Sequence, residues 1–539
     1  MIDLCWAIGT GLLFAASFPP LDFGFLGFIA IWPWCRLAEK GGILRVFLLG
    51  YVAGATLLAA GCFWLRLSHP LNWVLMVLIE ALFYGAFALL LRWLLRTGTI
   101  PVWLAMPVAW TSLELARSRG PFAGFPWLLL GYTQHRFVPL LQISDVTGVL
   151  GLSFLLSMVG GWLASVGRNS RRQVEEPGDR ILLGSIVVVS VLAAALVYGM
   201  LRCRQILPSQ EGPRLLILQA NIPQQLKNQG QEDSPQSAEE ILRKHLEIAR
   251  SGLQRSSAPI DYIVWPETMF PYALMETGDD AEAADIRDRI LRPLLLDRGS
   301  CGLVVGVVTI RGSGDEGGRF NSAVVFEADG IRSGTYHKAV LVPGGEYIPF
   351  LRSLPRALRD LVDRCARGIT GGILPDLSKG LGPRCLILKA QGKEVRTGVS
   401  ICFEIAHPDY QRRLVRDGAE FLINLSNEGW FPDSAEFAQY TAIAALRACE
   451  LKRPLVRAAN TGTSGWIDPF GRVHALELGG RRNGFSGSLE VAVPLVSPTT
   501  LYSRLGDWLG WTSLAILGLF AAQSFRKKKI VTLTRRTDL

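Results

Sequence analysis

Three side chains that could catalyse acyl transfer each close a short hydrophobic or β-branched stretch of the chain: Cys402, Glu267 and Lys338. A thiol is mostly protonated near neutral pH, so it becomes a nucleophile only when a base removes its proton. The oxyanion that forms when a thiolate attacks a carbonyl needs a cation or a hydrogen-bond donor beside it. These residue types therefore predict a triad in which Cys402 is the nucleophile, Glu267 the general base and Lys338 the oxyanion partner.

The three residues stand at the ends of predicted strands, where an open α/β sheet presents reactive groups to a crevice. Strands are expected at 214–219, 262–265, 303–309, 323–327, 334–338, 386–389, 395–402, 421–425 and 455–458. Apolar residues at helical spacing predict helices at 238–253 and 435–451, and the polar, glycine-containing stretch 224–237 is expected to be a loop. Because strands and helices alternate, we expect residues 205–500 to form one mixed α/β domain.

The part of the chain before this domain is strongly apolar. Of all residues, 49% are hydrophobic and the mean hydropathy is +0.28, values that indicate a membrane protein. Apolar runs predict membrane spans at 4–18, 24–37, 44–65, 73–93, 100–116, 146–166, 181–201 and 508–525. We therefore expect a membrane bundle of about eight helices, formed by residues 1–204 and 501–539.

Basic loops indicate how these helices are oriented. Lys and Arg gather at 36–45, 92–96 and 168–180, and Arg526–Lys529 follows the last span. All of these lie on one side of the membrane if seven helices precede the α/β domain, although Arg66, Arg117, Arg119 and Arg136 do not. Because short basic loops stay in the cytoplasm, the α/β domain is expected to be extracytoplasmic.

The composition argues against nucleic-acid binding and against a zinc site. The formal charge of +10 is spread along the chain and often flanks apolar runs, unlike the basic patch of a nucleic-acid-binding protein. The nine cysteines include no Cys-x-x-Cys pair, so their spacing does not suggest zinc ligands. Thiol-based acyl transfer needs neither a metal nor an organic cofactor, and none is expected.

Longer motifs resemble those of the apolipoprotein N-acyltransferases, a membrane-bound family of the nitrilase superfamily. These motifs are Gln219–Gln224, Tyr336–Pro349, Ser426–Phe431 and Arg457–Gly462 in the polar half, and Gly124–Tyr132 and Asp145–Gly151 in the hydrophobic half. The resemblance covers nearly the whole chain. It implies the nitrilase αββα sandwich for the α/β domain and a triad in the chain order Glu267, Lys338, Cys402.

The resemblance also implies that four residues near the triad shape the site or contact substrate. Glu346 is expected near the base, Phe403 and Glu404 beside the nucleophile, and Trp430 against an acyl chain. The chain departs from the family pattern at two positions, because Phe403 stands where a tyrosine is usual and Asn228 where a tryptophan is frequent. We expect these departures to affect substrate preference and not the thioester chemistry.

The function implied by the resemblance is the last acylation of bacterial lipoproteins, carried out in ping-pong fashion. The Cys402 thiolate attacks an acyl ester of a phospholipid, expected to be phosphatidylethanolamine, and forms a thioester. The α-amine of an apolipoprotein's S-diacylglyceryl-cysteine then takes the acyl chain as an amide. The resemblance implies a multi-pass monomer in the bacterial inner membrane, with its catalytic domain on the periplasmic side.

The residues leave other interpretations open. A membrane-anchored nitrilase-type amidase would hydrolyse a small C–N substrate, although a single anchoring helix would suffice for it. A membrane scaffold or transporter could carry a degenerate nitrilase-like domain, although an intact triad argues against degeneration. Within the site, His337 or His407 could replace Glu267 as the base, and His407 is expected to begin a surface helix.

Overall fold

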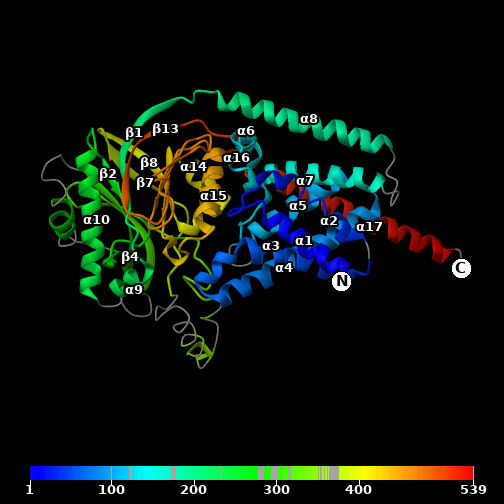
Figure 1. Ribbon diagram of the computed structural model, residues 1–539, viewed down its shortest axis with the longest axis horizontal. Coiled ribbons are helices and arrows are strands. Elements are labelled where there is room, and N and C mark those ends of the chain that lie inside the picture. Colours follow the sequence, from blue (N-terminus) through cyan, green and yellow to red (C-terminus); the bar gives the residue numbers. More distant parts are fainter. Residues whose placement is uncertain are drawn as a thin grey trace. The chain divides into compact units, whose positions relative to one another are not determined.

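The computed structural model describes every residue of the chain except 40, 99, 121–123, 171–177, 232–233, 277–283, 293–300, 313–316, 350, 352–354, 357, 361, 363, 365–375 and 538–539. The chain divides into two compact units. The helical unit comprises residues 1–63, 74–204 and 505–539, and the α/β unit comprises residues 64–73 and 205–504. Figure 1 shows the elements of both units.

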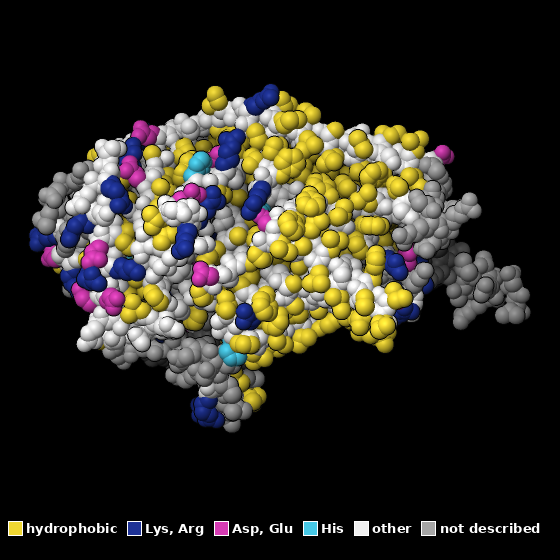
Figure 2. Space-filling model, in the orientation of Figure 1, with side chains coloured by type: hydrophobic (Ala, Val, Ile, Leu, Met, Phe, Trp, Pro, Cys, Tyr) yellow, Lys and Arg dark blue, Asp and Glu magenta, His cyan; other side chains and the backbone are white. Residues whose placement is uncertain are grey.

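The helical unit consists of helices joined by short connections. They are α1 (Ile2–Ala15), η1 (Gly24–Phe28), α2 (Trp34–Glu39), α3 (Ile43–Gly61), α4 (Pro70–Thr97), α5 (Val102–Ser118), η4 (Leu130–Gln134), α6 (Val138–Leu141), α7 (Ser144–Ser170), α8 (Gly178–Cys203) and α17 (Trp508–Thr537). Among the described residues, four stretches are long and apolar enough to span a membrane: α3, α4, residues 149–167 of α7, and most of α8. The apolar stretches of α1 and α17 are shorter. On the face in Figure 2, hydrophobic side chains cover the surface of these helices.

The expected membrane span at 24–37 is wrong. The stretch instead forms the short helix η1 and the start of α2, separated by turns. Pro33 lies immediately before α2, and a proline lacks an N–H and disfavours a helical conformation in the residue before it. A continuous helix through this position is therefore unfavourable, although the stretch is apolar enough to suggest one.

The α/β unit contains two mixed sheets. The first has the strand order β13-β1-β2-β4-β5-β6, with β3 beside β4. Its strands are β1 (Ser209–Gln219), β2 (Tyr262–Val264), β3 (Leu274–Met275), β4 (Gly302–Arg311), β5 (Gly318–Phe326), β6 (Arg332–His337) and β13 (Gly487–Val496). Because β2 is parallel to β4, and β5 is antiparallel to both β4 and β6, strands β2 and β6 run in the same direction.

The second sheet has the order β12-β11-β10-β9-β8-β7. Its strands are β7 (Cys385–Ala390), β8 (Lys393–Ile401), β9 (Phe421–Ser426), β10 (Leu455–Ala459), β11 (Gly465–Ile467) and β12 (Val473–Ala475). Strands β8, β9 and β10 are parallel, and β9 is fully buried, as expected of a strand covered on both faces.

Helices cover the outer faces of the two sheets (Figure 1). Helix α10 (Pro235–Arg255) buries Leu242, Ala249 and Leu253 in one hydrophobic core with residues of β1, β2 and β4. Helices α14 (Pro408–Arg416) and α15 (Glu436–Leu451) lie on the side of the second sheet. The order of layers is helix, sheet, sheet, helix, which is the sandwich that the family resemblance implies.

The predicted loop at 224–237 is also wrong, because it contains helix α9 (Gln224–Gln231) and the start of α10. Two side chains on this helix face inward. Leu226 packs against a small core around Ile222 and Met269, and Lys227 is 7% exposed. The helix is short, and its inward contacts are made by one leucine and one lysine. Its low apolar content therefore gave no helical pattern in the sequence.

Candidate active site

Cys402 lies at the end of β8, where the strand passes into the short helix η7 (Cys402–Ala406). Its φ angle is +51°, in the left-handed region that a residue with a side chain seldom occupies. Such backbone strain persists only where the surrounding structure holds it, and it often marks reactive sites. The sharp turn leaves Cys402 half-buried, while Ile401 before it and Phe403 after it are buried.

Glu267 follows β2 and is almost fully buried. One carboxylate oxygen, Oε1, accepts hydrogen bonds from Asn321 Nδ2 at 2.7 Å and from Lys338 Nζ at 3.2 Å. The other oxygen accepts a hydrogen bond from the backbone N–H of Asn427 at 2.9 Å. Three donors from three different segments thus fix the orientation of this carboxylate.

Lys338 follows β6, and 1% of its side chain is exposed. Its ammonium lies between two carboxylates, 3.2 Å from Glu267 Oε1 and 2.8 Å from Glu346 Oε1. Glu346 is itself held by the backbone N–H of Val342 at 2.8 Å. The structure therefore brings Glu346 next to the pair of Glu267 and Lys338, where the sequence analysis expected it.

The charges of this cluster act on the thiol of Cys402. Burial raises the pKa of Cys402 to about 12, the negative charge of Glu267 adds to this shift, and the positive charge of Lys338 opposes it. Burial also opposes ionisation of Glu267, but Lys338 and Lys227 outweigh it and hold the pKa of that carboxyl below its usual value. The thiol at rest is therefore protonated beside an ionised carboxylate, an arrangement suited to proton transfer from sulfur to Glu267.

Glu404 ties the turn at Cys402 to the segment after Lys338. Its Oε1 accepts hydrogen bonds from the backbone N–H groups of Ala339 at 2.6 Å and Val340 at 3.0 Å, and from Tyr336 Oη at 2.6 Å. Its Oε2 accepts one from the N–H of Ile401 at 2.8 Å. Burial nevertheless raises the pKa of Glu404 to about 7. Glu404 thus connects two strand ends that carry predicted catalytic residues.

The other predicted site residues have less polar surroundings. Phe403 is buried, and its ring meets that of His407 edge-on at 4.8 Å between centroids. Trp430, at 37% exposed, is among the exposed large hydrophobic side chains. The neighbouring Phe431 meets the ring of Trp64 edge-on at 4.7 Å. Exposed and half-exposed aromatic side chains therefore lie in the loop that follows β9.

Neither histidine is placed as the base. His337 Nδ1 lies 2.8 Å from Ser322 Oγ, and its Nε2 lies 3.3 Å from Glu276. His407 immediately precedes α14, whose exposed Arg413 and Arg416 make it a surface helix as expected, but the His407 side chain itself is buried, and burial lowers its pKa to about 3. A neutral imidazole of that acidity is a poor proton acceptor, so Glu267 remains the predicted base.

Five further polar residues lie around the cluster that were not predicted as site residues: Lys227, Asn321, Asn427, Tyr440 and Arg457. Tyr440 Oη is 3.4 Å from Cys402 Sγ. Lys227 Nζ donates a hydrogen bond to Thr268 Oγ1, and burial lowers the pKa of Lys227 to about 8. Asn427 and Arg457 had a signal, since they fall within the Ser426–Phe431 and Arg457–Gly462 motifs. The others looked like ordinary strand, loop or helix residues.

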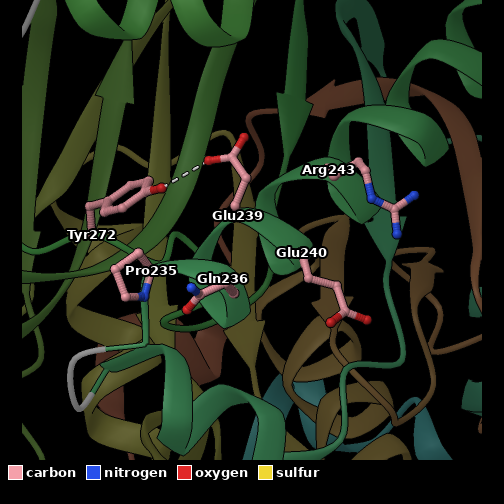
Figure 3. A pocket seen from close by; sticks show the side chains of 6 residues that line it. All are labelled: Pro235, Gln236, Glu239, Glu240, Arg243 and Tyr272. Carbon is pink, nitrogen blue, oxygen red and sulfur yellow. Dashed lines mark hydrogen bonds between the residues drawn. The ribbon is translucent and has the colours of Figure 1, made fainter.

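A hollow with a volume of about 650 Å³ lies on the outer helix of the first sheet, α10. Figure 3 shows its lining, in which the Tyr272 hydroxyl donates a hydrogen bond to Glu239 Oε2 at 3.2 Å. None of the three predicted triad residues lines it. Among the described residues, no group of three or more His, Cys, Asp or Glu side chains is arranged to hold a metal ion.

Comparisons with known proteins agree with the motifs. The model of the family described as "Apolipoprotein N-acyltransferase N-terminal domain" matches residues 10–162, and the model of the family described as "Carbon-nitrogen hydrolase" matches residues 217–479. The apolipoprotein N-acyltransferase of Geobacter metallireducens is 29% identical, over 98% of this chain and 96% of that protein. The one from Rhizobium rhizogenes is 30% identical, over 93% of this chain and 87% of that protein.

Among solved structures, an amidase from Nesterenkonia sp. is 15% identical with a TM-score of 0.33, over 56% of this chain and 95% of the amidase. The two family descriptions together cover both units of the chain, and the relatives are similar over nearly its whole length. The resemblance expected from the motifs is therefore confirmed: the chain belongs to the apolipoprotein N-acyltransferase family.

Proposed function

We propose that this protein is an N-acyltransferase that moves a fatty acyl chain from a phospholipid to the N-terminal α-amine of an apolipoprotein's S-diacylglyceryl-cysteine. Relatives that are similar over nearly the full chain are named apolipoprotein N-acyltransferases. The observation that carries the proposal is the buried pair of Glu267 and Lys338, whose charges act on the thiol of Cys402. An apolar helical unit in the same chain suits a substrate that resides in a membrane.

In the first half-reaction, Glu267 takes the proton of Cys402 Sγ, and the sulfur attacks the ester carbonyl of the phospholipid. Lys338 and a backbone N–H near Phe403 stabilise the oxyanion. The C–O bond to the glycerol backbone then breaks, and the alkoxide takes the proton from Glu267. The products are a Cys402 thioester and a lysophospholipid.

In the second half-reaction, the α-amine attacks the thioester carbonyl and gives one proton to Glu267. The C–S bond breaks, an amide forms, and the sulfur leaves as a thiolate that Glu267 reprotonates. The reaction needs an amine and not water as the acceptor, so the site must exclude water from the thioester. Trp430 and Phe431 supply apolar surface in the loop after β9 for that purpose, and the buried Trp64 packs against Phe431.

The finer features are proposed as well. We assign the acyl donor as phosphatidylethanolamine, and the location as the bacterial inner membrane, with a multi-pass helical unit, a monomeric state and the domain at 205–500 on the periplasmic side. The basic segment Arg526–Lys529 after the last apolar helix supports a cytoplasmic C-terminus. Part of the basic loop at 168–180 lies outside the described residues.

Intact-mass spectrometry of the purified full-length protein tests the proposal. Mixed with dioleoyl phosphatidylethanolamine, the protein is expected to gain the mass of one oleoyl group, which hydroxylamine removes because it cleaves thioesters. Adding a diacylglyceryl-cysteine peptide should also remove the group and produce the N-acyl peptide.

Two cysteine variants make the assignment specific. Cys402→Ala is expected to form no adduct. Cys385→Ala, which removes another half-buried free thiol of the same unit, is expected to behave like the native protein. Hydrolysis of small amides with no acyl adduct would contradict the proposal and favour an anchored amidase.

A further inference from the structure

Helix α15 brings a phenol to the nucleophile. Tyr440 is 3% exposed, and its Oη lies 3.4 Å from Cys402 Sγ, within hydrogen-bonding distance for a sulfur atom. Cys402 belongs to the turn after β8, whereas Tyr440 lies in the second turn of α15, so the contact joins two separate elements. Neither the triad nor the chemistry described above makes use of this hydroxyl.

The ring of Tyr440 is held by a buried arginine. The guanidinium carbon of Arg457 lies 4.6 Å from the centroid of the ring, a favourable cation–π distance. Arg457 comes from β10 and is fixed in turn by an ion pair with Glu428 and by the carbonyl oxygen of Thr463 at 3.2 Å. An anchored partner on its face restricts the ring, so the hydroxyl stays directed at the sulfur.

The surroundings keep the hydroxyl protonated. Burial raises the pKa of Tyr440 well above its ordinary value, and negative charge on Cys402 and on Glu436, one turn earlier in α15, acts in the same direction. A protonated phenol donates its hydrogen to a charged sulfur. Hydrogen bonds to charged groups are roughly twice as strong as those between neutral groups.

We propose that Tyr440 is a fourth catalytic residue, which donates a hydrogen bond to Cys402 Sγ whenever that sulfur carries negative charge. The inference rests on the thioester chemistry proposed above. In thioester formation, the bond stabilises the thiolate before its electron pair attacks the carbonyl. In aminolysis, it stabilises the same thiolate when the C–S bond breaks and the sulfur leaves with that pair. The phenol keeps its proton throughout, so proton transfer remains the task of Glu267.

The experiment compares the native full-length protein with Tyr440→Phe, which keeps the ring and removes only the hydroxyl. The rate of alkylation of Cys402 by iodoacetamide is measured against pH, by mass spectrometry of the peptide that contains Cys402, because the chain has other free thiols. The titratable and charged groups that act on this thiol are Lys227, Glu267, Lys338, Glu346, Tyr440 and Arg457. The variant changes only Tyr440, so a shift of the midpoint reports on its hydroxyl.

Removing a donor to a thiolate is expected to move the midpoint of this pH profile upward by about one pH unit. Aminolysis of the preformed acyl-enzyme by the diacylglyceryl peptide should slow about ten-fold, which is the same effect expressed as a rate. A midpoint and an aminolysis rate equal to those of the native protein would overturn the proposal.

Tyr262→Phe is the matched control. Its phenol is also buried, but it bonds to Glu327 Oε2 at 3.0 Å and to the N–H of Lys389 at 2.8 Å, at the opposite end of β2 from Glu267. This variant is expected to leave the midpoint for Cys402 unchanged. An equal shift in both variants would mean that loss of any buried phenol perturbs the domain, and would overturn a specific role for Tyr440.

Replacing Tyr440 by 3-fluorotyrosine covers the case in which Tyr440→Phe does not fold. The fluorine makes the phenol a stronger donor without removing it, so the midpoint should move downward; an unchanged or raised midpoint would contradict the proposal. Alkylation needs no acyl donor. A shifted midpoint in a protein that forms no acyl adduct would therefore refute the proposed function and leave the contact between Tyr440 and Cys402 in place.

Discussion

At the scale of single residues, the carboxylate of Glu267 has two opposite effects on Cys402: it is the predicted base for the thiol, and its negative charge also suppresses ionisation of that thiol. Burial and the carboxylate of Glu267 both raise the pKa of the thiol, and Lys338 offsets only part of the shift. A freely ionised thiolate would be rare at neutral pH in such a site. Activation by proton transfer to Glu267 during the attack agrees better with this arrangement than a preformed thiolate does.

Glu267→Gln separates the two roles of this carboxylate. A negative neighbour raises the pKa of an acid, so its removal should lower the pKa of Cys402 and increase the thiolate fraction at pH 7. We expect iodoacetamide to alkylate Cys402 faster than in the native protein, while acyl transfer falls by about 10²-fold or more because the base is gone. Glu276→Gln, which removes a carboxylate paired with Arg311, should change neither rate. Slower alkylation of Glu267→Gln would contradict this account.

At the scale of elements, the site depends on the direction in which strands end. Strands β2 and β6 run in the same direction in the first sheet, so Glu267 and Lys338, which follow their carboxyl ends, lie at the same end of the sheet. Glu404 accepts hydrogen bonds from both the segment after β6 and the end of β8, and so links the sheets at the site. Behind β2, the imidazole of His245 on α10 stacks on Trp265, with 4.5 Å between ring centroids.

His245 should make the α/β unit sensitive to acid. Burial lowers its pKa to about 4, below the value of about 6.5 expected in the unfolded chain. The unfolded state therefore binds more protons between these values, and the free energy of unfolding falls as the pH drops from 6.5 towards 4. The loss amounts to about 2 kcal/mol at pH 5.

Chemical unfolding at pH 7 and pH 5, followed by tryptophan fluorescence, measures this loss. His245→Phe keeps a ring against Trp265 and should show a smaller drop, with the remainder coming from other buried histidines such as His407. His474→Phe, which replaces an exposed ring stacked on Trp466, should keep the native pH dependence. An equal drop in the native protein and in His245→Phe would rule out this origin of the acid sensitivity.

At the scale of the whole molecule, two surfaces of different chemistry belong to one chain. Hydrophobic side chains cover the helical unit, and charged side chains are spread over the α/β unit (Figure 2). Helix α8 shows this clearly, since only 11% of its most apolar stretch is buried within the protein. Such a helix needs an apolar environment outside the protein, and lipid supplies one.

The proposed orientation can be tested with a protease site. Leu381 in the α/β unit is fully exposed, so a cleavage sequence inserted there should be accessible. In intact spheroplasts, we expect external protease to cut this site and to leave a tag placed after Leu539 untouched until the cells are lysed. Cleavage of the tag without lysis, or protection of the site at Leu381, would contradict the orientation given by the basic loops.

The sequence alone determined the features that depend on neighbouring residues. β-branched runs marked most strands, hydropathy marked the long apolar helices, and the strand-end positions of Glu267, Lys338 and Cys402 suggested a triad, because each signal lies within a few residues. Local signals failed where a single residue or contact decided the outcome. Pro33 interrupts an apolar stretch that would otherwise suggest one long helix. The polar stretch 224–231 forms helix α9 because its inward side chains pack against the domain.

Only the tertiary structure decided which side chains meet at the site. Asn321 and Asn427 bond to Glu267 from 54 and 160 residues away, and Tyr440 reaches Cys402 from another helix. Strand register and helix packing set these contacts, and neither can be read from the composition of one segment. A tyrosine in a buried helix looks like any other core residue until the fold places its hydroxyl beside a thiol.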